Sequence, residues 1–372
     1  MSKVKLGEVA REYKATVKSS VGMPTVGLEH LIPGEILLEY WDEGKDNTFT
    51  KSFKKGQMLF GRRRAYLKKA AVAPFDGVCS GDITVIEAIP EKMNTELLPF
   101  IIQNDLFFDY AVGKSAGSLS PRVKWESLKE YEFDLPDLNQ QNDLVDLLKA
   151  AYRTKKAYQN LITATDNLVK SQFIEMFGDP IENEKGWKHA LFPEVTTIVL
   201  GSTPRTNKAE YWDGNIKWIS PAELTDETFY VYDTVKHITE AGVAAAGLKP
   251  FPAGTVIFST RAPIGKTAIA GCEMYCNQGF KNFICGPELR PVYLYYLLKV
   301  KKEYFERLGT GTTFKELSRG AIEKISISVP PLQMQDEFEY LYLQSDKSKF
   351  ELKQAVEKID NLIKSLILQD EN

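Results

Sequence analysis

Two long stretches of the chain carry apolar and small residues at a spacing that predicts helices. In the first stretch, steps of four and three residues alternate through Leu147, Ala151, Thr154, Tyr158, Leu161, Thr165 and Leu168. The second stretch has the same steps at Leu341, Ser345, Ser348, Leu352, Ala355, Ile359, Leu362 and Leu366. This is the heptad spacing of a left-handed two-helix coiled coil. The alternative is a helix that lies on its own globular domain, although neither stretch has an obvious stop signal for about 35 residues.

Short β-like runs precede each helical stretch. Turn residues separate runs such as GQMLFG and GDITVIEA in the first half, and TVIFST and KNFIC in the second, as is typical of strands. One helix-like segment follows in each half, at 97–112 and 292–308, and then a strand-like run that ends in proline. The first long helix leaves the first globule and the second returns from the second globule. We therefore expect an α/β (α+β) fold, with two similar globules joined by an antiparallel two-helix coiled coil.

The two halves are also related by an internal repeat. The segment DNLVKS at 166–171 recurs as DNLIKS at 360–365, 194 residues later. At the same offset, further residues coincide: Gly117 with Gly311, Pro136 with Pro330, Leu138 with Leu332, Gln141 with Gln335, and Lys155 with Lys349. Upstream the offset changes, so that Cys79 coincides with Cys276 and the second copy carries an insertion. Repeats of this length are domain-sized, and we interpret them as two similar surfaces for two copies of one partner.

These patterns divide the chain into four parts. We place the globules at 1–137 and 181–331, and the helices at 138–180 and 332–372. The first helix is expected to stop at FGDP (177–180), because Gly178 can adopt a left-handed conformation and Pro180 prevents further helix. A pseudo-two-fold axis is expected to relate the two halves.

Composition is that of an ordinary globular protein, with 43% hydrophobic and 26% charged residues. No apolar run is long enough to span a membrane, and the first residues do not form a secretory signal. We therefore expect a cytoplasmic protein without a membrane partner. The four cysteines are too few for a disulfide framework, and their spacing is not that of a zinc site. We expect buried free thiols and no metal.

The distribution of charge says more than the net charge of −3. Between Asn47 and Phe75 there is no acidic residue. Eight basic residues lie in this stretch: Lys51, Lys54, Lys55, Arg62, Arg63, Arg64, Lys68 and Lys69. A local basic patch allows an acidic protein to bind phosphates.

Four segments carry a resemblance to a known family: GSTPRTNKAEYWDGNIKWISPAEL (201–224), VIFSTRAPIGKTAI (256–269), FKELSRGAIEKISISVPPLQMQ (314–335) and MFGDP (176–180). With them, the whole chain resembles the specificity (S) subunit of prokaryotic type I restriction–modification enzymes. The first copy lacks the segment at 201–224. The resemblance implies two target-recognition domains, each of which reads half of a gapped double-stranded DNA site.

The resemblance also implies partners. The helices would serve as a spacer and as a docking surface for two methyltransferase (modification) subunits, in a complex that also contains restriction/translocase subunits. S-adenosylmethionine, ATP and Mg²⁺ would be bound by these partner subunits and not by this chain.

Loops after the strands and after each domain helix are candidate DNA contacts. Arg261 and Lys266 follow the strand TVIFS, and Arg62 to Arg64 occupy the equivalent place in the first copy. The loop 113–122 corresponds to 309–319, where glycines and hydroxyls suit close approach to a DNA backbone and arginines suit phosphates or guanine edges. The full set of candidates is Lys54, Lys55, Arg62, Arg63, Arg64, Lys68, Lys69, Ser118, Arg122, Arg205, Thr260, Arg261, Lys266, Thr312, Thr313, Lys315 and Arg319. Solvated strand edges and ordinary polar loops are the alternatives.

No sequence motif indicates catalysis. APIGKT (262–267) resembles the end of a phosphate-binding loop, but Thr260 stands where that motif needs glycine. No methyltransferase motif, metal-ligand cluster or nucleophile triad is recognisable. We therefore predict a DNA-specificity subunit. A structural adaptor with two protein-binding globules is the main alternative, and a nuclease or fused methyltransferase is less well supported.

Overall fold

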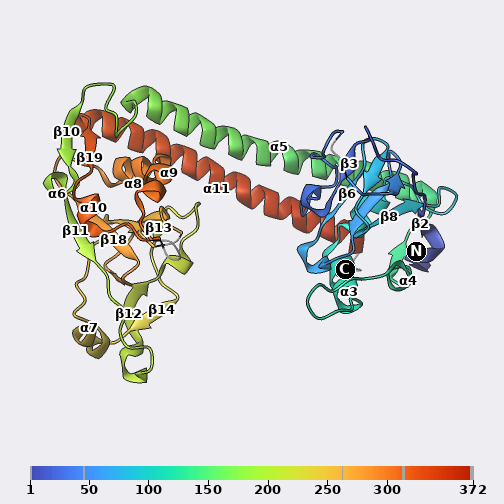
Figure 1. Ribbon diagram of the computed structural model, residues 1–372, viewed down its shortest axis with the longest axis horizontal. Coiled ribbons are helices and arrows are strands. Elements are labelled where there is room, and N and C mark those ends of the chain that lie inside the picture. Colours follow the sequence, from blue (N-terminus) through green and yellow to red (C-terminus); the bar gives the residue numbers. More distant parts are fainter. Residues whose placement is uncertain (1, 45–46, 262, 312–314, 369–372) are drawn as a thin grey trace. The chain divides into compact units, whose positions relative to one another are not determined.

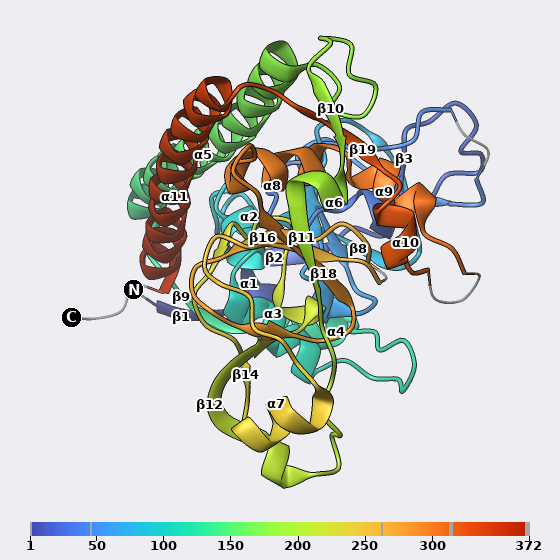
Figure 2. The ribbon, with the colours of Figure 1, turned by 90° about the vertical axis from the view of Figure 1, so that its left-hand side faces the viewer.

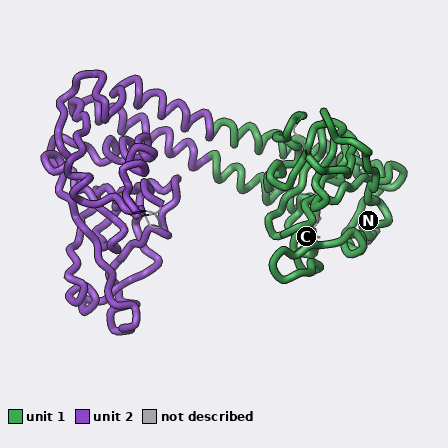
Figure 3. Tube along the Cα trace, viewed as in Figure 1, with its two compact units in different colours: residues 1–161, 352–372 green, residues 162–351 purple. Residues whose placement is uncertain are grey.

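The computed structural model describes residues 2–44, 47–261, 263–311 and 315–368. Contacts divide the chain into two compact units (Figure 3). Unit 1 comprises residues 1–161 and 352–372, and unit 2 comprises residues 162–351. Two long helices, α5 (Leu138–Phe177) and α11 (Leu332–Leu368), each contribute to both units (Figure 1). Each unit combines sheets with short helices, so the expected fold class is confirmed.

Unit 1 is built on an antiparallel sheet with the order β2-β8-β5-β6. Its strands are β2 (Ala10–Glu12), β8 (Ile83–Ala88), β5 (Met58–Gly61) and β6 (Ala70–Val72). A three-stranded sheet contains β3 (Thr25–Val26), β7 (Gly77–Cys79) and β4 (Lys51–Phe53), and a ribbon pairs β1 (Ser2–Lys5) with β9 (Glu132–Leu135). The short helices are α1 (Leu6–Val9), α2 (Leu98–Ile102), α3 (Asp105–Gly113) and α4 (Trp125–Leu128). Phe60 packs against Phe107 and Phe108 of α3 in the core, and burying each ring contributes about 2–3 kcal/mol.

Unit 2 repeats this plan with one more strand in its main sheet. The order β11-β18-β15-β16-β13 joins β11 (Thr196–Leu200), β18 (Phe280–Cys285), β15 (Val256–Ser259), β16 (Thr267–Ala270) and β13 (Tyr230–Val231). A second sheet contains β14 (Lys236–Ile238), β12 (Trp212–Ile219) and β17 (Tyr275–Cys276), and a ribbon pairs β10 (Lys188–Leu191) with β19 (Ser326–Val329). The short helices are α6 (Phe192–Val195), α7 (Glu240–Ala246), α8 (Pro291–Val300), α9 (Lys302–Leu308) and α10 (Arg319–Ile322).

Strand registers confirm the internal repeat. In unit 1, Val26 of β3 pairs in parallel with Cys79 of β7; in unit 2, Ile219 of β12 pairs in parallel with Cys276 of β17. The two cysteines therefore occupy equivalent positions, as their alignment predicts. The insertion lies around β12, α7 and β14, which gather at one end of unit 2 in both views (Figures 1 and 2).

The long helices pair antiparallel within each unit, and the repeated motif takes part in the pairing. In unit 1, Lys155 of α5 binds Asp360 of α11, with Nζ and Oδ1 2.7 Å apart. In unit 2, Lys349 of α11 binds Asp166 of α5 at 2.6 Å. Because the two lysines coincide in the repeat and so do the two aspartates, DNLVKS and DNLIKS provide the same ion pair twice.

The predicted seam of α5 is correct in one of its two rows and wrong by one residue in the other. Ala151 is buried and Tyr158 and Thr165 are half-buried, as predicted. In the other row Leu147, Leu161 and Leu168 are exposed, and the neighbouring Leu148 and Val169 are buried instead. On α11, Ser348 and Leu362 are likewise exposed, while the other predicted positions are half-buried. The physical reason is that a lysine stands in the seam of each helix, at Lys155 and Lys349. A search for apolar residues at heptad spacing skips such positions and selects the neighbouring row.

No helix within the described residues is both long and apolar enough to cross a lipid bilayer.

Candidate nucleic-acid interface

Three segments of unit 1 meet at the end of strand β5, and we call this place junction 1 (residues 61–64, 80–83 and 113–123). The backbone N–H of Arg62 donates to the carbonyl of Asp82 at 2.9 Å, and the N–H of Val123 donates to the carbonyl of Arg62 at 3.0 Å. Arg63 also forms a β-bridge with Arg122. The two loops that the sequence nominates in the first copy are therefore held together by backbone hydrogen bonds.

Unit 2 has the same arrangement, which we call junction 2 (residues 259–261, 277–280, 309–311 and 315–317). The N–H of Thr260 donates to Gly279, and the N–H of Leu317 donates to Thr260, both at 2.8 Å. Arg261 forms a β-bridge with Glu316. Gly117 and Gly311 lie at the turns of the two loops with φ of 116° and 115°, a conformation that favours glycine.

Asp82 is the centre of charge in junction 1. Arg122 donates to it twice, through Nε at 2.7 Å and Nη2 at 3.2 Å, and Arg63 lies 3.5 Å away. Arg63 also donates to Ser120 Oγ at 3.1 Å. The hydrogen bond and charge of Arg122 hold the pKa of Asp82 below its ordinary value, so the carboxylate is ionised at neutral pH. With two arginines on one aspartate, this cluster has an excess of positive charge.

Glu316 has the corresponding role in junction 2. Its carboxylate accepts from Arg261 Nε and from Lys281 Nζ, each at 3.0 Å. Burial acts to raise the pKa of Glu316, but Lys281 and Arg261 outweigh that effect and lower it. Lys281 is almost fully buried and also donates to Thr260 Oγ1 at 3.0 Å.

Thr260 and Arg62 differ from what the sequence predicts. Thr260 is 0% exposed because its hydroxyl bonds Gly279 and Lys281 inside junction 2, so it cannot contact a ligand directly. Arg62 is only half-exposed, and its Nε is buried without a hydrogen-bond partner among the described residues. Arg64 adopts a left-handed φ of 54° and is exposed. The three arginines therefore do not alternate along one extended strand.

The remaining lysines of the acid-free stretch do not join junction 1 in one patch. Lys54 and Lys55 lie before β5, at the end of that strand opposite to Arg62. Lys54 Nζ pairs with Asp76 at 2.8 Å, and the backbone N–H of Lys55 donates to the same carboxylate. Lys68 pairs with Asp105 at 2.5 Å, and Lys69 donates to the carbonyl of Leu28 at 2.6 Å. Acidic residues outside the stretch therefore neutralise part of its charge.

The other candidates of unit 2 lie around junction 2 or beside the inserted sheet. Lys315 is exposed, and Lys266 Nζ donates to the carbonyl of Pro221 at 3.2 Å. Arg319 opens α10 and pairs with Glu323 at 2.6 Å. The β-bridges show that Glu316, and not Arg319, occupies the position in unit 2 that is equivalent to Arg122 in unit 1. Ser118 is exposed in its loop, while Thr312 and Thr313 lie outside the described residues.

Tryptophans of the inserted part position Arg205. Trp212 Nε1 donates to the carbonyl of Arg205 at 3.2 Å, and Trp218 Nε1 donates to that of Ser202 at 3.0 Å. The two indoles pack edge to face. These contacts hold the exposed loop that carries Arg205 against β12.

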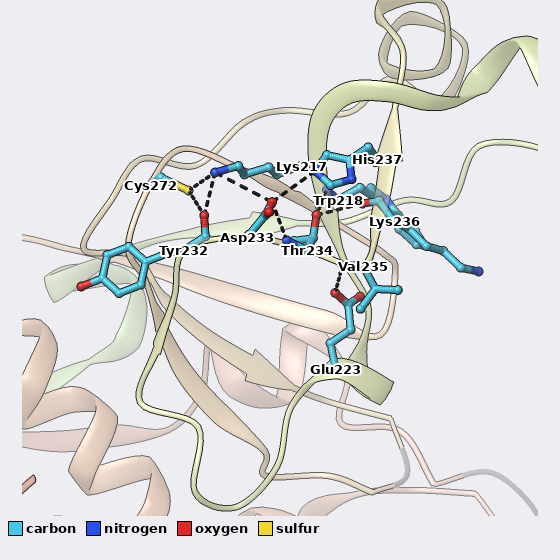
Figure 4. Close-up of polar contacts among 10 residues, drawn as sticks. All are labelled: Lys217, Trp218, Glu223, Tyr232, Asp233, Thr234, Val235, Lys236, His237 and Cys272. Atoms are coloured by element: carbon cyan, nitrogen blue, oxygen red, sulfur yellow. Dashed lines mark hydrogen bonds and ion pairs between the residues drawn. The ribbon is translucent and has the colours of Figure 1, made fainter. Parts of the chain in front are cut away.

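A polar cluster fastens the turn between β13 and β14 to β12 (Figure 4). Lys217 Nζ donates to the carbonyl of Tyr232 at 2.6 Å, and Thr234 Oγ1 accepts from the N–H of Trp218 at 3.1 Å. His237 lies 3.2 Å from Asp233. Within the described ranges, no group of three or more His, Cys, Asp and Glu side chains could hold a metal ion.

Four members of the two junctions are not among the sequence candidates: Asp82, Ser120, Lys281 and Glu316. Asp82 and Glu316 are acidic and lie outside the acid-free stretch, and Lys281 lies in strand β18 and not in a loop. The one available signal was the repeat itself, since an offset of 194 aligns Arg122 with Glu316.

Comparison with known proteins identifies one family twice in the chain. The type I restriction modification DNA specificity domain matches residues 3–164 and 184–358. The type I restriction enzyme MjaIX specificity subunit of Methanocaldococcus jannaschii is 38% identical over 149 residues, which is 39% of this chain and 34% of that protein. The type I restriction enzyme EcoDI specificity subunit of Escherichia coli is 28% identical over 129 residues, which is 34% of this chain and 28% of that protein. The matched regions thus span about a third of these two relatives.

Solved structures share the fold over nearly the whole chain. A chain from a study of complex assembly and conformational transition of the type I R-M system has a TM-score of 0.60 at 20% identity, covering 98% of this chain and 96% of that chain. The S subunit of a type I restriction–modification system from M. genitalium has a TM-score of 0.57 at 14% identity, with the same coverage. At these identities the likeness concerns the fold alone.

Proposed function

Because the chain belongs to the type I restriction modification DNA specificity family, we propose that it recognises a bipartite double-stranded DNA sequence, one half with each unit. The observation that carries this proposal is the double match of the specificity domain, once in each half of the chain. Each matched half contains one junction where an arginine-bearing strand end meets a glycine-containing loop. Arginine, hydroxyl and backbone N–H groups of this kind bind phosphates and base edges.

We further propose that the chain docks two modification subunits, which bind S-adenosylmethionine, and that restriction subunits use ATP and Mg²⁺. Two exposed leucines support duplicated docking. Leu168 is 57% exposed and Leu362 is 45% exposed, and they occupy the same position of DNLVKS and DNLIKS. Exposed apolar side chains in a repeated setting suit two copies of the same partner. In this proposal catalysis resides in the partner subunits.

DNA binding by the assembled complex tests the proposal. We expect affinity for duplex DNA to fall as salt rises, because phosphate contacts release counterions. In a host that carries the modification subunits, methylated adenines should flank two short sequences with a constant gap, and deleting this gene should abolish them. A complex that assembles but binds DNA at no salt concentration would favour the adaptor function instead.

A further inference from the structure

Each junction contains an exposed arginine whose Nε donates to a carboxylate, but the two units build this pair from different elements. In junction 1, the arginine is Arg122 of the loop and the carboxylate is Asp82 of the turn before β8. In junction 2, the carboxylate is Glu316, at the loop position equivalent to Arg122, and the arginine is Arg261 after β15. Both junctions therefore contain an arginine–carboxylate pair, but the two residues come from different elements in the two units.

Local packing disfavours building the pair in the same way in both units. Gly279 occupies the position of Asp82, since each accepts the equivalent backbone hydrogen bond, from Thr260 and from Arg62. A Cβ at Gly279 would lie 3.0 Å from Asn277 Oδ1 and 3.1 Å from the Pro221 ring. A carboxylate side chain is thus disfavoured there, and Glu316 supplies the acceptor from the loop.

The geometry of Arg122 leaves one edge of its guanidinium available. Nε and one N–H of Nη2 are used on Asp82, so both N–H groups of Nη1 and the second N–H of Nη2 remain. The side chain is 45% exposed, whereas Asp82 beneath it is 18% exposed. Two neighbouring donors in one plane match the O6 and N7 acceptors of guanine in the major groove. Because the carboxylate fixes the plane in advance, less side-chain entropy is lost on binding.

We propose that Arg122 and Arg261 are specificity-determining residues that each read a guanine, one in each half-site. This inference rests on the proposed function and deepens it. Because the two guanidinium groups start from different elements, the guanine is read at a different position of each half-site. The equivalent loop position holds Arg122 in unit 1 and Glu316 in unit 2, and this difference is one physical reason why two copies of one domain recognise two different sequences.

The test is selection from randomised duplex DNA by the full chain assembled with its modification subunits. For R122A we expect one position of one half-site to lose its guanine preference by about 10- to 100-fold, while the other half-site is unchanged. R261A should relax one guanine in the other half-site only. R122K should fail to restore the preference, because an ammonium lacks the planar fork, and it serves as the second variant if R122A fails to fold. D82N should weaken the same position as R122A.

Arg11 provides a matched control. It pairs with Glu87 at 2.7 Å, near the end of β8 opposite to Asp82, so R11A removes an arginine–carboxylate pair of unit 1 away from the junction. R11A should leave both half-sites unchanged.

Three outcomes would overturn the inference. If R122A weakens all sequences equally and lowers the salt slope by about one unit, Arg122 is a phosphate contact. If R122A relaxes a position that is not a guanine, or leaves the selected DNA motif unchanged, Arg122 does not read a guanine, while the proposed function stands. If the complex that contains the chain without any substitution selects no DNA sequence, the proposed function fails together with this inference.

Discussion

Gln141 and Gln335 occupy the same place in the two copies and form the same bonds. Both are buried near the start of a long helix. Each donates through Nε2 to a proline carbonyl, Pro136 or Pro330, at 2.8 Å. Each also accepts a backbone N–H through Oε1, from Asn94 at 2.7 Å or from Arg290 at 2.8 Å. One buried side chain thus ties each long helix to its globule.

Replacing Gln335 with methionine should destabilise unit 2. Methionine keeps the length of the side chain, so the loss isolates the hydrogen bonds to Pro330, Glu288 and Arg290. Each buried group left unpaired costs about 1–3 kcal/mol. Urea unfolding should show this loss for Q335M, whereas Q333A, at an exposed neighbour, should change stability by less than about 0.5 kcal/mol. A Q335M protein as stable as Q333A would mean that the bonds contribute nothing.

The cysteines offer a second prediction at this scale. Burial raises the pKa of Cys79 and of Cys276 to about 12, and a raised pKa keeps a thiol protonated and unreactive at pH 8. Cys272 is partly exposed. Mass spectrometry after iodoacetamide treatment of native protein should find Cys272 modified and Cys79 and Cys276 unmodified. Both buried thiols should react once the protein is unfolded, and a C272S variant controls for the site. If iodoacetamide modified Cys276 in the native protein as fast as it modified Cys272, the burial of Cys276 would be contradicted.

Some residue positions were predictable from the sequence and others were not. The repeat alignment gave equivalent glycines at 117 and 311, and both adopt the same left-handed turn. It gave no indication that Thr260 is buried, because a threonine at the end of a strand is compatible with either face. The role of Asp82 depends on a loop 40 residues away, a separation that no local pattern reports.

At the scale of elements, the pairing of α5 with α11 is the feature that the sequence predicted only in part. The heptad spacing indicates both helices, and the connectivity indicates their antiparallel pairing, but one of the two rows predicted on α5 is wrong by one residue. That row is exposed, at Leu147, Leu161 and Leu168. A mixed pattern of apolar residues on a helix can therefore encode a buried seam and an exposed row at once.

The ion pair between Lys155 and Asp360 should couple the two helices in unit 1. K155E places like charges together and should destabilise the protein, while the exchanged pair K155E/D360K should recover most of the loss. Because Asp360 is partly exposed, solvent screens the pair, and we expect a coupling energy of about 0.5–1 kcal/mol. A double-mutant cycle by urea unfolding measures it, with exposed Lys170, changed to glutamate, as the control. Additive effects of the two changes would show that the pair does not hold the helices together.

At the scale of the whole molecule, duplication is what made the fold predictable. Each strand ribbon and sheet of unit 1 has a counterpart in unit 2, so a pattern that is weak in one copy is supported by the other. The part that escaped prediction is the part without a counterpart, namely helix α7 of the insertion. Junctions 1 and 2 are intermediate: their loops were predicted from composition, whereas their charged centres required the tertiary contacts.

The length of the paired helices provides the last prediction. We expect that inserting four residues into each helix lengthens it by roughly 6 Å, and that the gap between half-sites grows by one or two base pairs, since DNA rises about 3.4 Å per base pair. The insertions belong between Leu161 and Ile162 and between Glu351 and Leu352, where the two units divide. At these places the ion pairs Lys155–Asp360 and Lys349–Asp166 each stay within their own unit. Methylome mapping in a host with the modification subunits reports both half-sites and their gap.

The control for this experiment is the same insertion in α5 alone. It shifts one helix against the other, so at least one of the two ion pairs must break, and we expect loss of stability and of methylation. In the doubly extended protein, four residues nearly complete one helical turn of 3.6 residues, which limits rotation of one unit about the helix axis. Unchanged half-sites with a wider gap are therefore the expected result. Methylation at the original gap, or altered half-sites with the gap unchanged, would mean that the helices do not set the spacing.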